Sequence, residues 1–254
     1  AALQLNPGDS SLLLQRGQVL LTLGRASEAL VDFDAALALD SSSTEVRQGR
    51  AASLEELMRF EEAMAEYRQL QELVPGAPYY LLKEGECLFR LKRYEDCIKL
   101  CTNFLEEQEY SDMRHLRGSA YWELKNWPKA VADFNELKIR RAEWFDFLNA
   151  AYCQAKAGDF EGATQDAERA LNPRANAAVV RYVTAVIYAL RAASHPDSEE
   201  GRAARAEDVA KALDYLEQSA VESFGGQVTL QQVATDGDFA ALQHEPRFLK
   251  LIGR

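Results

Sequence analysis

Apolar residues along most of this chain recur every three or four positions, the spacing that gathers them on one face of an α-helix. This spacing predicts one helix over residues 10–23 and a second over 27–39, with Gly24 and Arg25 forming the turn between them. The same succession of helix, short turn and helix returns along the sequence to about residue 223. We therefore expect an all-α chain built from paired helices.

The helix pairs repeat with a nearly constant period. Small residues mark one position in the first helix of each pair, at steps of 34, 34, 33, 33 and 34: Gly17, Ala51, Gly85, Gly118, Ala151 and Ala185. A second series marks the second helices, at steps of 34, 34, 33 and 33: Ala29, Ala63, Cys97, Ala130 and Ala163. Close helix contacts tolerate only small side chains. Two such series therefore predict a stack of helical hairpins, each burying its apolar face on its neighbours.

The period divides residues 1–223 into a partial repeat at 1–9 and six full repeats. The full repeats fall at about 10–43, 44–77, 78–110, 111–143, 144–177 and 178–223. The sixth carries an insert near 194–205, and its polar residues 194–201 are expected to form an exposed loop before a helix that starts at about residue 206. Residues 1–7 look like the end of an earlier second helix, so we expect a fragment or processed piece of a longer array.

Two spacings carry a family resemblance. Gly118-x2-Tyr121 and Ala130-x3-Phe134 occur together in one repeat, and Ala29-x3-Phe33 gives the second spacing again. These motifs resemble the tetratricopeptide repeat (TPR). The resemblance implies a right-handed superhelical solenoid of antiparallel helix pairs that binds other proteins and is not an enzyme.

Residues 224–254 differ from the repeats. They contain Asp236-Gly237-Asp238-Phe239 and Glu245-Pro246-Arg247-Phe248, which resemble the end segment of bacterial TPR arrays. A repeat array needs a terminal unit to cover its last apolar face, so we expect a short helical cap in which Phe239, Leu242, Phe248 and Leu251 provide the cover. The resemblance also implies an alternative function, as the regulatory or docking arm of a larger bacterial multidomain protein such as a serine/threonine kinase.

Composition and the motifs present limit the classes of function that the chain can have. The net charge is −11, which opposes nucleic-acid binding. No long uncharged apolar run predicts membrane insertion, and four cysteines in a chain of 254 residues do not suggest a disulfide framework, so a cytoplasmic location is favoured. We find no phosphate loop, nucleophile elbow or kinase signature, and we expect no catalysis and no cofactor. Cys97 and Cys101 are one helical turn apart, as in half a metal site, but they occupy core positions of the repeat, and we expect packing.

The resemblance implies that the first helix of each repeat lines a concave groove. On each of these helices, a stripe of residues at successive steps of three, four and three positions faces the groove. The stripe residues expected to bind a partner are Tyr79, Leu82, Glu86, Phe89, His115, Ser119, Trp122, Phe145, Leu148, Tyr152 and Tyr182. Aromatic anchors suit an apolar helix or extended peptide. Two alternatives remain: the aromatic side chains pack between repeats or beneath the cap, or exposed apolar faces mediate self-association. Binding of chaperone C-termini is disfavoured, because Leu14 and Gln18 supply no cation at the corresponding positions.

Overall fold

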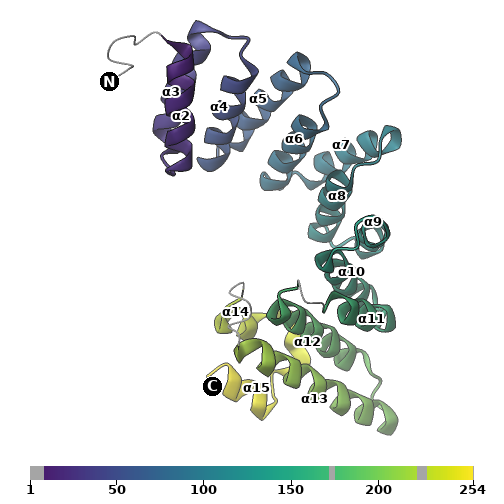
Figure 1. Ribbon diagram of the computed structural model, residues 1–254. Coiled ribbons are helices and arrows are strands. Elements are labelled where there is room, and N and C mark those ends of the chain that lie inside the picture. The colour runs from purple at the N-terminus through teal and green to yellow at the C-terminus, as the bar shows by residue number, and fades with distance from the viewer. Residues whose placement is uncertain (1–8, 172–174, 222–227, 254) are drawn as a thin grey trace. The chain divides into compact units, whose positions relative to one another are not determined.

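The computed structural model of the protein describes residues 9–171, 175–221 and 228–253. The expectation for residues 1–7 lies outside these ranges. The described residues form helices joined by short loops, and no strand occurs among them (Figure 1). The chain consists of two compact parts, residues 1–120 and 121–254.

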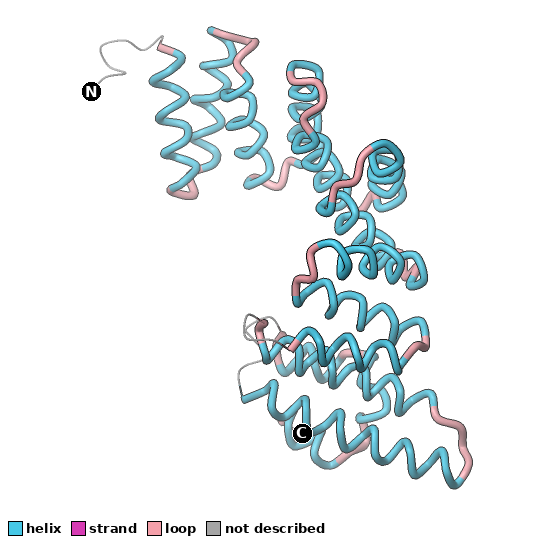
Figure 2. The backbone as a smooth tube through the Cα atoms, turned by 45° about the vertical axis from the view of Figure 1, so that its right-hand side comes forward, coloured by secondary structure: helices cyan, strands magenta, loops and turns pink. Residues whose placement is uncertain are grey.

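The N-terminal part consists of helices that follow one another in pairs. Its helices are α2 (Ser10–Thr22), α3 (Ala26–Leu39), α4 (Thr44–Glu56), α5 (Phe60–Leu73), α6 (Pro78–Arg90), α7 (Tyr94–Glu107) and the first ten residues of α8 (Ser111–Glu123). Consecutive helices pack against each other, as the tube drawing in Figure 2 also shows. The predicted pairs of about a dozen residues per helix are therefore confirmed in this part.

The turn inside each of the first five helix pairs is the same structure repeated. One residue with positive φ ends the first helix of these pairs: Gly24, Met58, Lys92, Lys125 and Gly158. In each turn this residue's N–H donates to a carbonyl three residues back, and the next N–H to one five residues back, as at Lys92 to Phe89 and Arg93 to Leu88, both 2.9 Å. These bonds satisfy carbonyls left open at the helix end. Glycine fills only two of the five positions.

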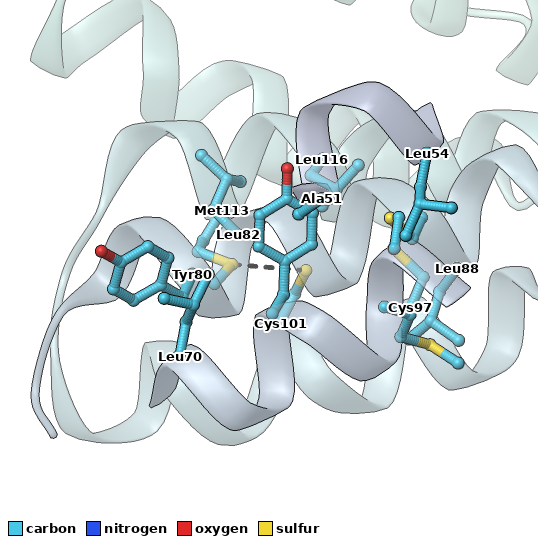
Figure 3. Packing of buried hydrophobic residues seen from close by; sticks show 14 of the residues in the cluster. Ala51, Leu54, Leu70, Tyr80, Leu82, Leu88, Cys97, Cys101, Met113 and Leu116 are labelled. Carbon is cyan, nitrogen blue, oxygen red and sulfur yellow. Dashed lines mark hydrogen bonds between the residues drawn. The ribbon is translucent and has the colours of Figure 1, made fainter. Parts of the chain in front are cut away.

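The repeating glycine and aromatic residues meet in the core. Phe33 of α3 is fully buried, and Gly17 of α2 and Gly49 of α4 both lie close to its ring. A larger cluster spans α3 to α8, and Figure 3 shows Cys101 beside Met113, whose sulfur atoms are 3.8 Å apart. Cys97 and Cys101 are fully buried there, which confirms that they are packing residues.

The C-terminal part continues the pairs and ends in a cap. Its helices are α9 (Trp127–Arg140), α10 (Trp144–Ala157), α11 (Phe160–Ala170), α12 (Ala177–Ser194), α13 (Glu199–Val221), α14 (Leu230–Thr235), the 3₁₀ helix η2 (Gly237–Leu242) and α15 (Pro246–Leu251). Phe239, Leu242 and Phe248 are fully buried and pack with residues of α12 and α13, and Leu251 packs partly buried against the same cluster. The expected helical cap is confirmed.

The loop expected at 194–201 is present but shorter, at residues 195–198, of which 196–198 are exposed. Helix α12 runs through Ser194, and α13 begins at Glu199 rather than at about residue 206. Contacts within this segment explain the earlier helix start, because Gly201 is buried against the backbone of Pro196 and His195 bonds Asp208 at 2.7 Å. The Ser198 hydroxyl also accepts from the Gly201 N–H at 3.0 Å, which starts the helix early.

Helix α12 is unusually apolar. Its mean hydropathy of 1.3 over Ala177–Ser194 passes the length and composition criteria for a membrane span, and 44% of this stretch is buried. Ala185, Val186 and Ala189 pack with α13 and the cap. Packing as the core helix of the last pair accounts for this composition. The absence of membrane insertion stays a prediction.

Candidate functional site

A hollow of about 570 Å³ lies between α6 and α8 in the N-terminal part. It is lined by Leu82, Glu86, Phe89 and Arg90 of α6 and by Asp112, His115, Leu116 and Ser119 of α8. Leu82, Glu86 and Phe89 are four and three positions apart and so share one face of that helix, and Arg90 lies four positions beyond Glu86. Pro78, whose fixed φ suits a first helical turn, starts α6.

The floor of this hollow is apolar and its rim is charged. Leu82 and Leu116 are buried, at 8% and 9% exposure, and the half-buried Phe89 ring meets Tyr94 edge to face at 5.3 Å. Glu86 is bonded by Lys83 at 2.8 Å and remains 41% exposed, while Arg90 is exposed. An apolar floor with polar groups around it is the usual make-up of a ligand site.

The hollow brings together five of the residues that the sequence predicted: Leu82, Glu86, Phe89, His115 and Ser119. Tyr79 is not among its lining residues; it is 52% exposed and meets Tyr80 edge to face at 5.5 Å. The predicted stripe did not include two residues that line the hollow, Arg90 and Leu116. Each directly follows a stripe residue in the sequence, so a stripe one residue wider would have included both.

The predicted residues of the C-terminal part have partners inside the chain. Tyr152 stacks on Trp122 with ring centroids 4.4 Å apart, and its hydroxyl donates to Asp238 of η2 at 2.8 Å. Burial, together with this carboxylate, raises the pKa of Tyr152. The Tyr182 hydroxyl donates to Asp236 at 2.9 Å. Two stripe tyrosines therefore lie against the cap.

The remaining two predicted residues are also engaged. Leu148 is 6% exposed and packs with Ala170 and Val180. The Phe145 ring lies 4.8 Å from the guanidinium of Arg141.

In this part, then, the stripe residues have intramolecular contacts, and Trp122 and Tyr152 also line a hollow of about 370 Å³ together with Trp127 and Lys156. The hollow between α6 and α8 is larger, at about 570 Å³, and more of the predicted residues line it.

A buried thiol and phenol lie close to the carboxylate of Glu55 on α4. The Tyr67 hydroxyl donates to Glu55 at 2.9 Å, and the Cys87 thiol lies 4.0 Å from it. Burial first, and then this carboxylate, raise the pKa of Cys87 to about 12. A thiol with so high a pKa is protonated at neutral pH and is a poor nucleophile.

Comparison with known proteins places the fold. No family model matches the chain. It is 25% identical over 154 residues to the DnaJ homolog subfamily C member 3 homolog of Dictyostelium discoideum, a match that covers 54% of this chain and 30% of that protein. The chain therefore spans less than a third of the length of this relative.

Solved structures agree on the architecture. PilF from Pseudomonas aeruginosa superposes with a TM-score of 0.63 at 19% identity, covering 93% of this chain and 97% of PilF. A tetratricopeptide repeat protein from Parabacteroides merdae gives 0.60 at 19% identity, covering 100% of this chain and 89% of that one. YrrB, described as a TPR protein with an unusual peptide-binding site, gives 0.52 at 19% identity, covering 67% and 89%. The fold of this chain is that of the tetratricopeptide repeat proteins.

Proposed function

We propose that this protein is a non-enzymatic interaction scaffold that binds a peptide or helical segment of a partner in the hollow between α6 and α8. The observation that carries the proposal is the convergence of five stripe residues, from two successive first helices, on one open hollow of about 570 Å³. A hollow of this size accepts one or two side chains of a partner. The likeness of the fold to YrrB, described as having a peptide-binding site, supports the same reading.

The lining indicates the chemistry of the bound segment. Leu82, Phe89 and Leu116 offer apolar surface to an aliphatic or aromatic anchor. Around them, Glu86 and Asp112 present carboxylates beside the single guanidinium of Arg90. The preferred segment therefore carries an apolar anchor flanked by at least one basic residue, which also suits a chain with net charge −11.

The test begins with peptides selected from a random display library on the wild-type protein. Titration calorimetry then compares the best peptide on the wild type, on Ser119→Arg and on Ser41→Arg. Ser119 is half-buried in the lining, so an arginine there fills the hollow, whereas Ser41 is exposed in a loop outside it and controls for added charge. We expect Ser119→Arg to weaken binding by about tenfold or more, equivalent to about 1.4 kcal/mol, and Ser41→Arg to leave it unchanged. Equal affinities for all three proteins would assign the peptide to another surface.

A further inference from the structure

A second hollow, of about 460 Å³, lies along α13 in the C-terminal part. Its floor is formed by small and aliphatic residues, and its rim by charged ones. The lining residues are Arg202, Arg205, Ala206, Val209, Ala210 and Leu213 of α13, with Ala241, Glu245 and Arg247 of the cap. This hollow uses none of the residues between α6 and α8, so it is independent of the function proposed above.

The floor is apolar and leaves room for a guest side chain. Val209 and Leu213 are 9% and 2% exposed and form the base of the hollow. Ala206 and Ala210 are exposed on the same helix, one turn apart. Since alanine fills little space, a branched aliphatic side chain from outside has apolar surface to contact there.

Among the residues that line the hollow itself, positive charges outnumber negative ones, unlike in the chain as a whole. Three arginines and one glutamate line it, although the protein has 40 acidic and 29 basic residues. Arg247 is bonded by Asp214 and Glu217 at 2.7 and 2.9 Å, and Arg202 reaches Asp197 at 3.1 Å. Two of the arginines thus have carboxylate partners.

Arg205, unlike the other two arginines, bonds a backbone carbonyl and not a carboxylate in the described part of the chain. It donates Nη2 to the carbonyl oxygen of His195 at 2.7 Å, and no described carboxylate forms an ion pair with it. Its Nε atom is buried and has no hydrogen-bond acceptor among the described residues. The residue as a whole is half-buried, so its guanidinium can still donate a charge-assisted bond to an incoming carboxylate, a partner that no described residue supplies.

We propose that this hollow docks an acidic amphipathic segment of a partner protein. A carboxylate of the segment bonds Arg205, with Arg202 beside it, and an aliphatic side chain of the segment rests on Ala206 and Ala210. Complementary charge fixes the register of the segment, and the apolar contact contributes the larger share of affinity.

The probes are two fluorescein-labelled helical peptides of about 15 residues, or about four turns. Both carry leucines along one face, and the opposite face is glutamate in one and lysine in the other. Fluorescence anisotropy measures both against the wild type, Ala210→Glu, Arg205→Gln and Gln218→Glu. Ala210 and Gln218 are both exposed on α13, and only Ala210 lines the hollow, so Gln218→Glu is the matched control for added negative charge. Melting curves by circular dichroism confirm that each variant is folded.

We expect the glutamate peptide to bind the wild type and Gln218→Glu alike, and to bind Ala210→Glu and Arg205→Gln about tenfold more weakly or worse. The lysine peptide should not bind this hollow. Absence of binding by the glutamate peptide, equal binding of both peptides, or full affinity in Ala210→Glu would overturn the proposal. So would a dimer of the unlabelled protein that Ala210→Glu dissociates, because a second copy would then be the occupant.

Discussion

The tight contact around Phe33 predicts that Gly49→Ala destabilises the wild-type protein but stabilises a variant that lacks the Phe33 ring. A double-mutant cycle measures this change in sign of its effect on the free energy of unfolding. A Cβ atom added at Gly49 would lie 2.5 Å from Cζ of the ring, and one added at Gly17 would lie 2.7 Å from the same ring. Carbon atoms normally approach to about 3.5–4.0 Å. The methyl group of Gly49→Ala must therefore displace the ring or a helix by about 1 Å, and the ring has no space to retreat toward Gly17.

The magnitude follows from two opposing effects. Overpacking a full core costs about 1–3 kcal/mol, whereas replacing a helical glycine by alanine stabilises a helix by about 1 kcal/mol. We expect Gly49→Ala to lower the free energy of unfolding by about 1 kcal/mol in the wild type. In a Phe33→Leu background the clashing ring is gone, and Gly49→Ala should instead raise the free energy of unfolding by up to about 1 kcal/mol.

Urea unfolding followed by circular dichroism measures the cycle. Because repeat arrays unfold in stages, hydrogen exchange of the α3 amides provides a local readout. Gly24→Ala is the control: Gly24 has φ +71° and nothing within 4 Å of an added Cβ. Gly24→Ala should lower the free energy of unfolding by about 1–2 kcal/mol through backbone strain alone, and by the same amount with Phe33 as with Leu at position 33. The same effect of Gly49→Ala in both backgrounds would refute the packing argument.

Three further predictions concern the turns, a thiol and an ion pair. Lys92 holds φ at 58°, so Lys92→Gly should raise the free energy of unfolding by up to about 1 kcal/mol; an unchanged or lower urea midpoint would contradict this strain. Cys87, with its pKa raised to about 12, should resist iodoacetamide in the native protein at pH 7.5 and react fully in denaturant, as mass spectrometry would show; rapid native alkylation would contradict its burial. Burial opposes the ionised form of Asp208, but hydrogen bonds, foremost from Arg191, outweigh it and lower the pKa of this carboxyl. The stability it contributes is therefore present above about pH 4, its unfolded pKa, and is lost as pH falls through the lower folded pKa. Asp208→Asn should be less stable than the wild type at pH 7 and should lose less on acidification, and parallel melting temperatures across that range would count against the ion pair.

The repeating part of the fold could be predicted from the sequence because the patterns that specify it, helical spacing and turn residues, are local. The period of small residues predicted the helix pairs, and the turn at Gly24 lies where the apolar pattern breaks. The loop expected at 194–201 was drawn too long, because residues 199–201 resemble a loop in isolation. Ser198 is a local signal for the helix start that the sequence analysis did not use, whereas the contact of His195 with Asp208 cannot be seen in a local pattern.

The candidate site, like the fold, could be predicted from the sequence only in part. Leu82 and Phe89 follow from helical spacing on α6, which sequence shows directly. Whether Tyr152 and Tyr182 are open to a partner does not follow, because their hydrogen-bond partners are 86 and 54 residues away in the cap. The arginine-rimmed hollow on α13 was not predicted either, since it requires the cap to fold back beside that helix.

Hydrogen exchange with and without the selected peptide tests the central claim most directly, because it locates the bound segment without relying on a variant. The account predicts added protection in α6 around residues 82–90 and in α8 around residues 112–119, with α3 and α5 unchanged. Protection that falls instead on the second helices, and leaves α6 and α8 as they are in the free protein, would contradict it.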